Sequence, residues 1–275
     1  MSAPESETPA ALRFGDLGLP EPLLAALAEV GYESPSPIQA ATIPALLAGR
    51  DVLGTAQTGT GKTAAFALPM LDRLTANAPR RTGAIRALIL TPTRELALQI
   101  GESFDAYGKY LKLRSTVIFG GVGQAPQVEA LKKGVDILIA CPGRLNDLIG
   151  QGFIDLSNLE IFVLDEADRM LDMGFFKDVT RIIEATPIER ELVLFSATTN
   201  QDVLTIAWKY QNDPVEVRIE ATKENRPQIT QYVINTEREQ KYENLLYLLD
   251  SDVYQKIMVF INTKDMTQRL CKRLK

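Results

Sequence analysis

The segment Ala56–Thr63, with the sequence Ala-Gln-Thr-Gly-Thr-Gly-Lys-Thr, contains the residue types that bind phosphate. Gly59 and Gly61 can adopt backbone angles that turn several amide N–H groups toward one anion. A helix beginning near Gly61 would add the positive end of its dipole. Lys62 can reach the β- and γ-phosphates of a nucleotide, and the Thr63 hydroxyl can ligate Mg²⁺. The segment therefore predicts a nucleotide-phosphate site.

Two adjacent carboxylates, Asp165 and Glu166, follow the apolar run 159–164. A β-branched and apolar run of this length is typical of a central parallel strand. Asp165, at its carboxyl end, can hold the Mg²⁺ shell through water, and Glu166 can orient or deprotonate an attacking water. Acidic clusters alone are more often solvated surface, but a buried strand carries this one. We therefore predict Lys62, Asp165 and Glu166 as catalytic residues of nucleotide hydrolysis.

Strand and helix patterns alternate along most of the chain. Strands are expected at 51–54, 87–90, 115–119, 136–140, 161–164, 191–195 and 215–219. Helices are expected at 21–30, 94–111, 123–133 and 175–186. This alternation predicts an α/β fold with a parallel sheet and helices on both faces. Ligands of such sheets bind at the carboxyl ends of the strands, where the candidate residues fall.

Composition excludes several kinds of chemistry. The 275 residues include no histidine, which excludes Ser-His-Asp hydrolysis and histidine metal sites and leaves Glu166 as the natural base. Cys141 and Cys271 lack metal-site spacing and are expected as reduced thiols in a cytoplasm. The net charge of −5 argues against nucleic-acid binding through bulk charge, so such binding would be local. No apolar run approaches the ~18 residues of a membrane span.

The ordered motifs of the chain resemble those of DEAD-box RNA helicases. Asp165-Glu166-Ala167-Asp168 is the signature of that family. The other motifs occur in the family's order at residues 31–39 (the Q motif), 92–97 (motif Ia), 120–121 (the glycine doublet), 141–144 (motif Ib) and 196–198 (motif III). Two positions depart from the family pattern: Ala56 replaces a glycine of the strict phosphate loop, and Cys141 replaces a threonine of motif Ib.

The resemblance implies that the nucleotide is ATP. Gln39 would read adenine through its amide, which offers a donor and an acceptor, and would select ATP over GTP. Phe14 would stack on the base, although a buried core aromatic is the simpler interpretation without the Q motif. Thr63 and Asp165 would hold Mg²⁺. The complete nucleotide-binding set is Phe14, Tyr32, Gln39, Gln57, Thr58, Gly59, Thr60, Gly61, Lys62 and Thr63.

The resemblance also implies an RNA surface that contacts the backbone with little sequence specificity. Its expected residues are Pro92, Thr93, Arg94, Gly121, Cys141, Gly143 and Arg144. Cys141 lacks the strong hydroxyl donor of a threonine, which weakens the expectation at this position. Asp168, Ser196 and Thr198 would couple the nucleotide site to the RNA site.

The expected organisation has four parts: a disordered tail at 1–12, a helicase ATP-binding domain at 13–220, a linker at 221–227, and the start of a second RecA-like lobe at 228–275. In the last part we expect strands at 229–235 and 257–262 and helices at 242–250 and 266–275. The segment 257–264 resembles motif IV. The family's final motif, His-Arg-x-Gly-Arg-x-x-Arg, is not in the sequence. We therefore expect a truncated, poorly packed or mobile second lobe and ATP binding with little turnover.

Three functional hypotheses stay open. The first is an ATP-dependent RNA helicase that uses ATP and Mg²⁺ for local RNA unwinding or remodelling of RNA–protein complexes. The second is a non-hydrolysing half-helicase that binds ATP and RNA and acts with a protein partner or a complete second lobe. The third is a DNA helicase or transporter ATPase, against which the Q motif and motif III argue. A cytoplasmic location without a membrane contact is expected for the first two.

Overall fold

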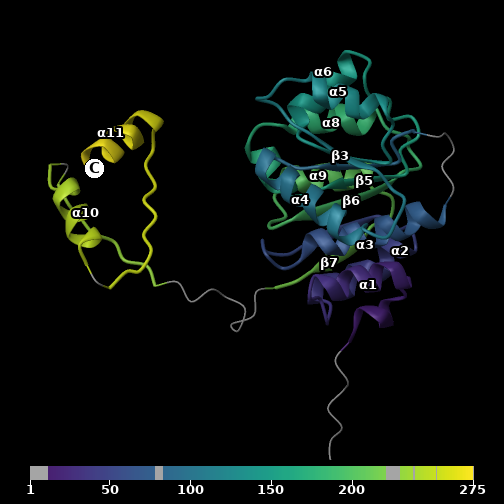
Figure 1. Cartoon of the computed structure of the whole chain (residues 1–275), viewed down its shortest axis with the longest axis horizontal. Helices are drawn as coiled ribbons and strands as arrows, with labels where there is room; N and C mark the ends of the chain where they lie inside the picture. The colour runs from purple at the N-terminus through teal and green to yellow at the C-terminus, as the bar shows by residue number, and fades with distance from the viewer. Residues whose placement is uncertain (1–11, 78–82, 221–229, 238, 252, 275) are drawn as a thin grey trace, which may run out of the picture. The chain divides into compact units, whose positions relative to one another are not determined.

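The computed structural model describes residues 12–77, 83–220, 230–237, 239–251 and 253–274 (Figure 1). The chain divides into two compact units, Met1–Asn225 and Arg226–Lys275, which are described separately below. The linker expected at 221–227 lies outside the described residues, as does the expected tail except for Leu12.

The first unit is built on a seven-stranded parallel sheet with the order β3-β4-β2-β5-β6-β1-β7. The strands are β1 Val52–Thr55, β2 Ala87–Leu90, β3 Ser115–Ile118, β4 Ile137–Ala140, β5 Ile161–Leu164, β6 Glu191–Ser196 and β7 Val215–Arg218. The predicted α/β class with a parallel sheet is confirmed, and all seven strands lie where the sequence predicts them.

The central strands are apolar at successive positions because both faces of the sheet are covered. In β2, Ala87 and Ile89 pack into one cluster of buried side chains, and Leu88 and Leu90 pack into the other. Successive side chains of a strand point to opposite faces, so both sets must be apolar. Edge strand β7 differs, because Glu216 alternates with half-buried residues.

Helices cover the two faces in two groups. The helices are the 3₁₀ turn η1 Phe14–Leu17 and the α-helices α1 Glu21–Glu29, α2 Pro37–Leu47, α3 Lys62–Ala76, α4 Arg94–Tyr107, α5 Ala125–Lys132, α6 Pro142–Gly150, α7 Ala167–Asp172, α8 Phe176–Glu184 and α9 Gln201–Tyr210. Side chains of α1–α4 belong to one buried cluster and those of α5–α9 to the other. Figure 1 shows α1–α3 on one side of the sheet and α5, α6 and α8 on the other.

The strand registers bring the carboxyl ends of the strands level. Leu90 pairs with both Ala140 and Leu164, and Thr55 pairs with Ser196. The loops that follow β1, β2, β4, β5 and β6 therefore leave the sheet along one edge. The strand order places β3, β4 and β2 in one half of this edge and β5, β6 and β1 in the other.

The described residues of the second unit include two helices, α10 Lys241–Leu249 and α11 Lys264–Leu274, close to the predicted ranges. The strands predicted at 229–235 and 257–262 are wrong: none of the described residues in these ranges is in a strand. A strand needs a hydrogen-bonded neighbour, and the described part of this unit has no sheet for either segment to join. Phe260 is accordingly 89% exposed.

Candidate nucleotide and nucleic-acid site

The glycine-rich segment forms the loop between β1 and α3. Gly59 and Gly61 have φ angles of 84° and 89°, in the left-handed region that side chains with a Cβ rarely adopt. A Cβ on Gly61 would collide with the carboxamide of Gln39, whereas Gly59 has open space around it. α3 begins directly after Gly61, at Lys62. The loop therefore has the backbone and the helix start that a phosphate cradle needs.

Two side chains of the Q motif hold this loop. Gln39 Nε2 donates to the carbonyl of Gly61 at 3.0 Å, and Ser36 Oγ donates to the carbonyl of Thr60 at 2.7 Å. The Gln39 Oε1 atom accepts from Ser36 N at 2.7 Å. Gln39 thus lies beside the loop, with one amide N–H and one carbonyl oxygen already bonded. Each of these two groups can make one further hydrogen bond.

Lys62 and Asp165 are buried charged residues in the same site. Lys62 is 7% exposed, and its Nζ donates to the carbonyl of Ala56 at 2.9 Å. Burial raises the pKa of Asp165 to about 6, although the positive charge of Lys62 opposes this shift. The neighbouring Glu166 carboxylate raises it further. A cation that enters the site would stabilise the ionised form of this buried carboxylate.

Glu166 links β5 to α7 in a strained backbone conformation. Its φ angle is 51°, which is rare for a residue with a long side chain. Glu166 Oε2 accepts from Arg169 Nη1 at 3.0 Å, one turn along α7. The side chain of Glu166 is 11% exposed and that of Arg169 is 55% exposed. The ion pair therefore fixes one oxygen of the candidate base.

The candidate coupling residues meet between the ends of β5 and β6. Asp168 Oδ2 accepts from the backbone N and the hydroxyl of Thr198, at 2.9 and 2.8 Å. Ser196 Oγ accepts from Asp168 N at 3.3 Å and donates to the carbonyl of Thr198 at 2.6 Å. Burial acts to raise the pKa of Asp168, but hydrogen bonds from Thr198 and Ser196 hold it below its ordinary value.

Phe14 lies in the core of the first unit and is 4% exposed. Its ring stacks on Tyr32, with 6.2 Å between centroids and 16° between planes. Tyr32 is 39% exposed and accepts a hydrogen bond from Tyr107. Within this pair, Tyr32 presents more surface to a base than Phe14 does.

The candidate RNA residues line the other half of the edge, at the ends of β2, β3 and β4. Thr93 caps α4, and Arg94 extends its guanidinium over the ring of Phe119 at 4.8 Å from the centroid. Gly121 is exposed and has a φ angle of 79°. Gly143 is exposed in the first turn of α6. Pro92 is buried, which leaves its side chain little surface for an RNA contact.

Cys141 lies between β4 and α6 as the N-cap residue of α6, in the half-buried position where the family resemblance expects a threonine. Burial, with a smaller contribution from Glu95, raises the pKa of its thiol to about 11. The thiol is therefore protonated at neutral pH and is a weak hydrogen-bond donor.

The residues present fit Mg²⁺ bound together with nucleotide phosphates. No group of three His, Cys, Asp or Glu side chains in the described part of the chain could hold a metal by itself. Mg²⁺ commonly uses one or two protein ligands together with substrate phosphates and water. The Thr63 hydroxyl and the buried Asp165 carboxylate would be such a pair of ligands.

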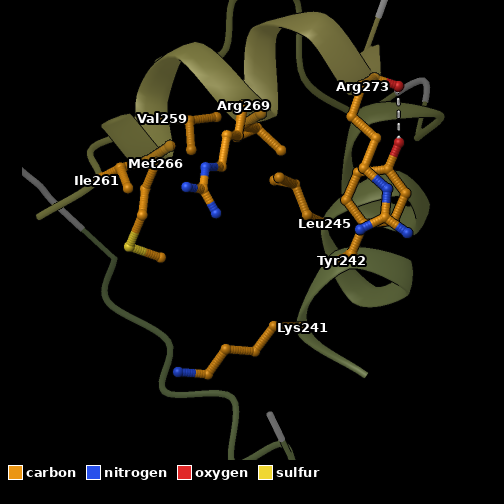
Figure 2. A pocket seen from close by; sticks show the side chains of 9 residues that line it. Lys241, Tyr242, Leu245, Val259, Ile261, Met266, Arg269 and Arg273 are labelled. Atoms are coloured by element: carbon orange, nitrogen blue, oxygen red, sulfur yellow. Dashed lines mark hydrogen bonds between the residues drawn. The ribbon is translucent and has the colours of Figure 1, made fainter. Parts of the chain in front are cut away.

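A groove of about 450 Å³ lies in the second unit, and none of the candidate residues above lines it (Figure 2). It is lined by Lys241, Tyr242, Leu245, Val259, Ile261, Met266, Arg269, Leu270 and Arg273. The Tyr242 hydroxyl donates to the carbonyl of Arg273, which ties α10 to α11. Among the described helices, none is long and apolar enough to cross a membrane.

Residues that the sequence analysis did not single out also take part in these contacts, among them Ser36, Phe119 and Arg169. Ser36 has a sequence signal, because Ser36-x-x-Gln39 matches a capping box, which the start of α2 contains. Arg169 follows Glu166 by three residues, a spacing that brings side chains together on a helix. Phe119 has no such signal, since its partner Arg94 is distant in sequence.

Comparison with known proteins decides the family. The family model described as DEAD/DEAH box helicase matches residues 36–206. The chain belongs to this family. The DEAD box protein from the hyperthermophile Methanococcus jannaschii is similar in structure, with a TM-score of 0.72 and 35% sequence identity. The match covers 96% of this chain and 70% of that one.

Two curated relatives are ATP-dependent RNA helicases by name. The ATP-dependent RNA helicase DeaD of Mycobacterium tuberculosis is 43% identical over 279 residues, covering 100% of this chain and 48% of the relative. The ATP-dependent RNA helicase DeaD of Escherichia coli is 42% identical over 262 residues, covering 95% of this chain and 41% of the relative. This helicase-family chain therefore spans less than half the length of these two relatives.

Proposed function

We propose that the first unit binds ATP with Mg²⁺ and an RNA backbone, as the nucleotide-binding lobe of an ATP-dependent RNA helicase. The main support is the meeting of Lys62, Asp165 and Glu166 at the carboxyl ends of β1 and β5. The positive charge of Lys62 acts on the buried Asp165 carboxylate, and Glu166 is the next residue. The names of the relatives, ATP-dependent RNA helicases, support the same substrate class.

In this proposal each residue of the nucleotide site has one task. Backbone N–H groups of the loop at Gly59 and Gly61 bind phosphate oxygens, and Lys62 moves from the carbonyl of Ala56 to the β- and γ-phosphates. Thr63 and Asp165 hold Mg²⁺, which would neutralise charge on the phosphates. Glu166 accepts the proton of the attacking water through Oε1, because Arg169 holds Oε2.

Base selection is assigned to Gln39, whose remaining N–H and carbonyl lone pair can pair with adenine. Its bond to Gly61 would connect the base to the phosphate loop. Tyr32 and the edge of Phe14 would contact the base. Gln57, Thr58 and Thr60 complete the proposed set, with the hydroxyl of Thr60 bonded to the carbonyl of Gln57 at 2.8 Å.

RNA would lie along the half of the sheet edge formed by β3, β4 and β2. Backbone N–H groups at the exposed Gly121 and Gly143 and the guanidinium of Arg94 would bind phosphate oxygens. Asp168, Ser196 and Thr198 would connect this half to the nucleotide half. We further propose a cytoplasmic location.

The second candidate is a half-helicase that binds ATP and RNA without turnover. The sequence observation that favours it is the lack of a His-Arg-x-Gly-Arg-x-x-Arg string within residues 1–275. An arginine that stabilises the γ-phosphate is worth ~10³–10⁵ in rate. Turnover would then depend on an arginine from another polypeptide or a complete second lobe.

Steady-state ATPase measurements test both candidates. The chain is assayed with and without RNA, alone and mixed with a separately produced second lobe of a related helicase. We expect RNA-stimulated turnover only in the mixture. Glu166→Gln should bind ATP like the parent and abolish this turnover. RNA-stimulated turnover by the chain alone would refute the need for an added arginine, and a fully active Glu166→Gln variant would refute the role of Glu166.

A further inference from the structure

The glycine loop, defined here as residues 120–123 after β3, is held by side chains from two helices. Gln127 in α5 accepts from Phe119 N and donates to Phe119 O, both at 3.2 Å. Arg144 in α6 donates from Nη2 to the carbonyl of Val122 at 2.9 Å. These contacts fix both ends of a segment whose glycines would otherwise sample many backbone conformations.

The guanidinium of Arg144 is turned into the protein. The Arg144 side chain is 12% exposed, and its Nε lies 3.9 Å from Asp147 Oδ2. Nη1 is buried and has no hydrogen-bond partner within the described part of the chain. Nη2 is used by the carbonyl of Val122. A phosphate could therefore reach this guanidinium only after the contact with the glycine loop had opened.

We infer that Arg144 is a positioning residue that holds the glycine loop in place for RNA, and that it makes no direct contact with a phosphate. This inference rests on the RNA binding proposed above. Arg94 provides the contrast, because it is exposed and its guanidinium lies over the ring of Phe119. Arg94 can bind a phosphate oxygen without losing a hydrogen bond to the backbone.

Salt dependence distinguishes the two roles. A cation that neutralises a phosphate releases a counterion, so removing it flattens the plot of log affinity against log salt by about 0.7 on single-stranded nucleic acid. A positioning residue changes the affinity without changing that slope. The slope therefore reports whether a given arginine touches the RNA backbone, whereas a single affinity does not.

The experiment measures binding of a fluorescent single-stranded RNA over a range of salt concentrations. Arg144→Gln should weaken binding about fivefold, the equivalent of one hydrogen bond, with the parent slope retained. Arg144→Lys, which keeps the charge, should weaken binding equally, because an ammonium cannot reproduce the guanidinium contacts. Gln127→Ala should behave in the same way. Arg94→Gln should flatten the slope, and Arg181→Gln, on the exposed face of α8, should change nothing.

Two results of the RNA-binding experiment would overturn the inference: a flattened slope in Arg144→Gln, or binding restored by Arg144→Lys. A second measurement needs no RNA. The amide NMR signals of the glycine loop should shift and exchange faster with solvent in Arg144→Gln but not in Arg94→Gln. Unchanged loop signals in Arg144→Gln would refute the inference. If the parent fails to bind RNA, the proposed function fails, while the NMR result still decides the role of Arg144.

Discussion

Asp168 accepts two hydrogen bonds from Thr198 on one carboxylate oxygen, from the backbone N at 2.9 Å and from the hydroxyl at 2.8 Å. Asp168 lies in the first turn of α7 after β5, and Thr198 follows β6. The contact therefore joins the carboxyl ends of two neighbouring strands. The two donors of Thr198 favour the ionised form of the Asp168 carboxylate. The stability of this edge of the sheet therefore depends on the charge of Asp168.

Thr198→Val should destabilise the first unit by about 1–3 kcal/mol, because a buried carboxylate loses one charge-assisted hydrogen bond. The folded state lowers the pKa of Asp168, so this stabilisation is present above the unfolded pKa and is lost as the pH falls through the folded value. Chemical denaturation at neutral and acidic pH measures both effects. Thr205→Val, in the exposed part of α9, is the matched control. Equal losses at both pH values would contradict the account.

Asp165→Asn should stabilise the protein at neutral pH when nucleotide and Mg²⁺ are absent. Burial raises the pKa of Asp165 to about 6, so the folded state holds a proton that the unfolded chain releases near pH 4. Stability therefore falls as the pH rises between about 4 and 6. Removing the charge should raise the free energy of unfolding by roughly 1–3 kcal/mol at pH values above this range. Thermal denaturation measures this increase, with Asp172→Asn as an exposed control. A less stable Asp165→Asn protein at neutral pH would be inconsistent with this charge penalty.

Gln39→Ala and Ser36→Ala separate base selection from support of the loop. Both variants lose a hydrogen bond to the phosphate loop, at Gly61 and Thr60 respectively. Each should weaken ATP and GTP binding several-fold, about 1 kcal/mol for one hydrogen bond. Gln39→Ala should also erase the preference for ATP, whereas Ser36→Ala should keep it. Competition binding with the two nucleotides measures the ratio. A preference that survives in Gln39→Ala would show that adenine is recognised elsewhere.

The central strands of the first unit were predictable because burial on both faces of the sheet determines their apolar pattern. The runs at 87–90 and 161–164 are continuously apolar and end at polar residues, and the structure has both strands at those bounds. The run at 257–262 has the same pattern but is not a strand. Its apolar side chains indicate a sheet position, but strand formation also requires a hydrogen-bonded neighbour, which an isolated pattern does not show.

The residue types of the candidate site were predictable from the sequence, but the orientations of its side chains were not. Lys62, Asp165 and Glu166 meet because they follow strand ends, which the alternation of elements determines. The direction of a guanidinium is not determined in this way. The resemblance placed Arg144 on an RNA surface, whereas its side chain bonds the carbonyl of Val122. That contact depends on how α6 packs beside the loop after β3, which local sequence does not determine.

Binding of ATP to the parent chain and to Lys62→Ala tests the central claim most directly. Calorimetric titration with ATP and Mg²⁺ should show one site on the parent and on Lys177→Ala, an exposed lysine of α8. Lys62→Ala should lose at least about tenfold in affinity, because the phosphates lose a charge-assisted hydrogen bond, while its unfolding transition stays cooperative. Equal ATP affinity in the parent and in a folded Lys62→Ala protein would contradict the assignment of this loop as the nucleotide site.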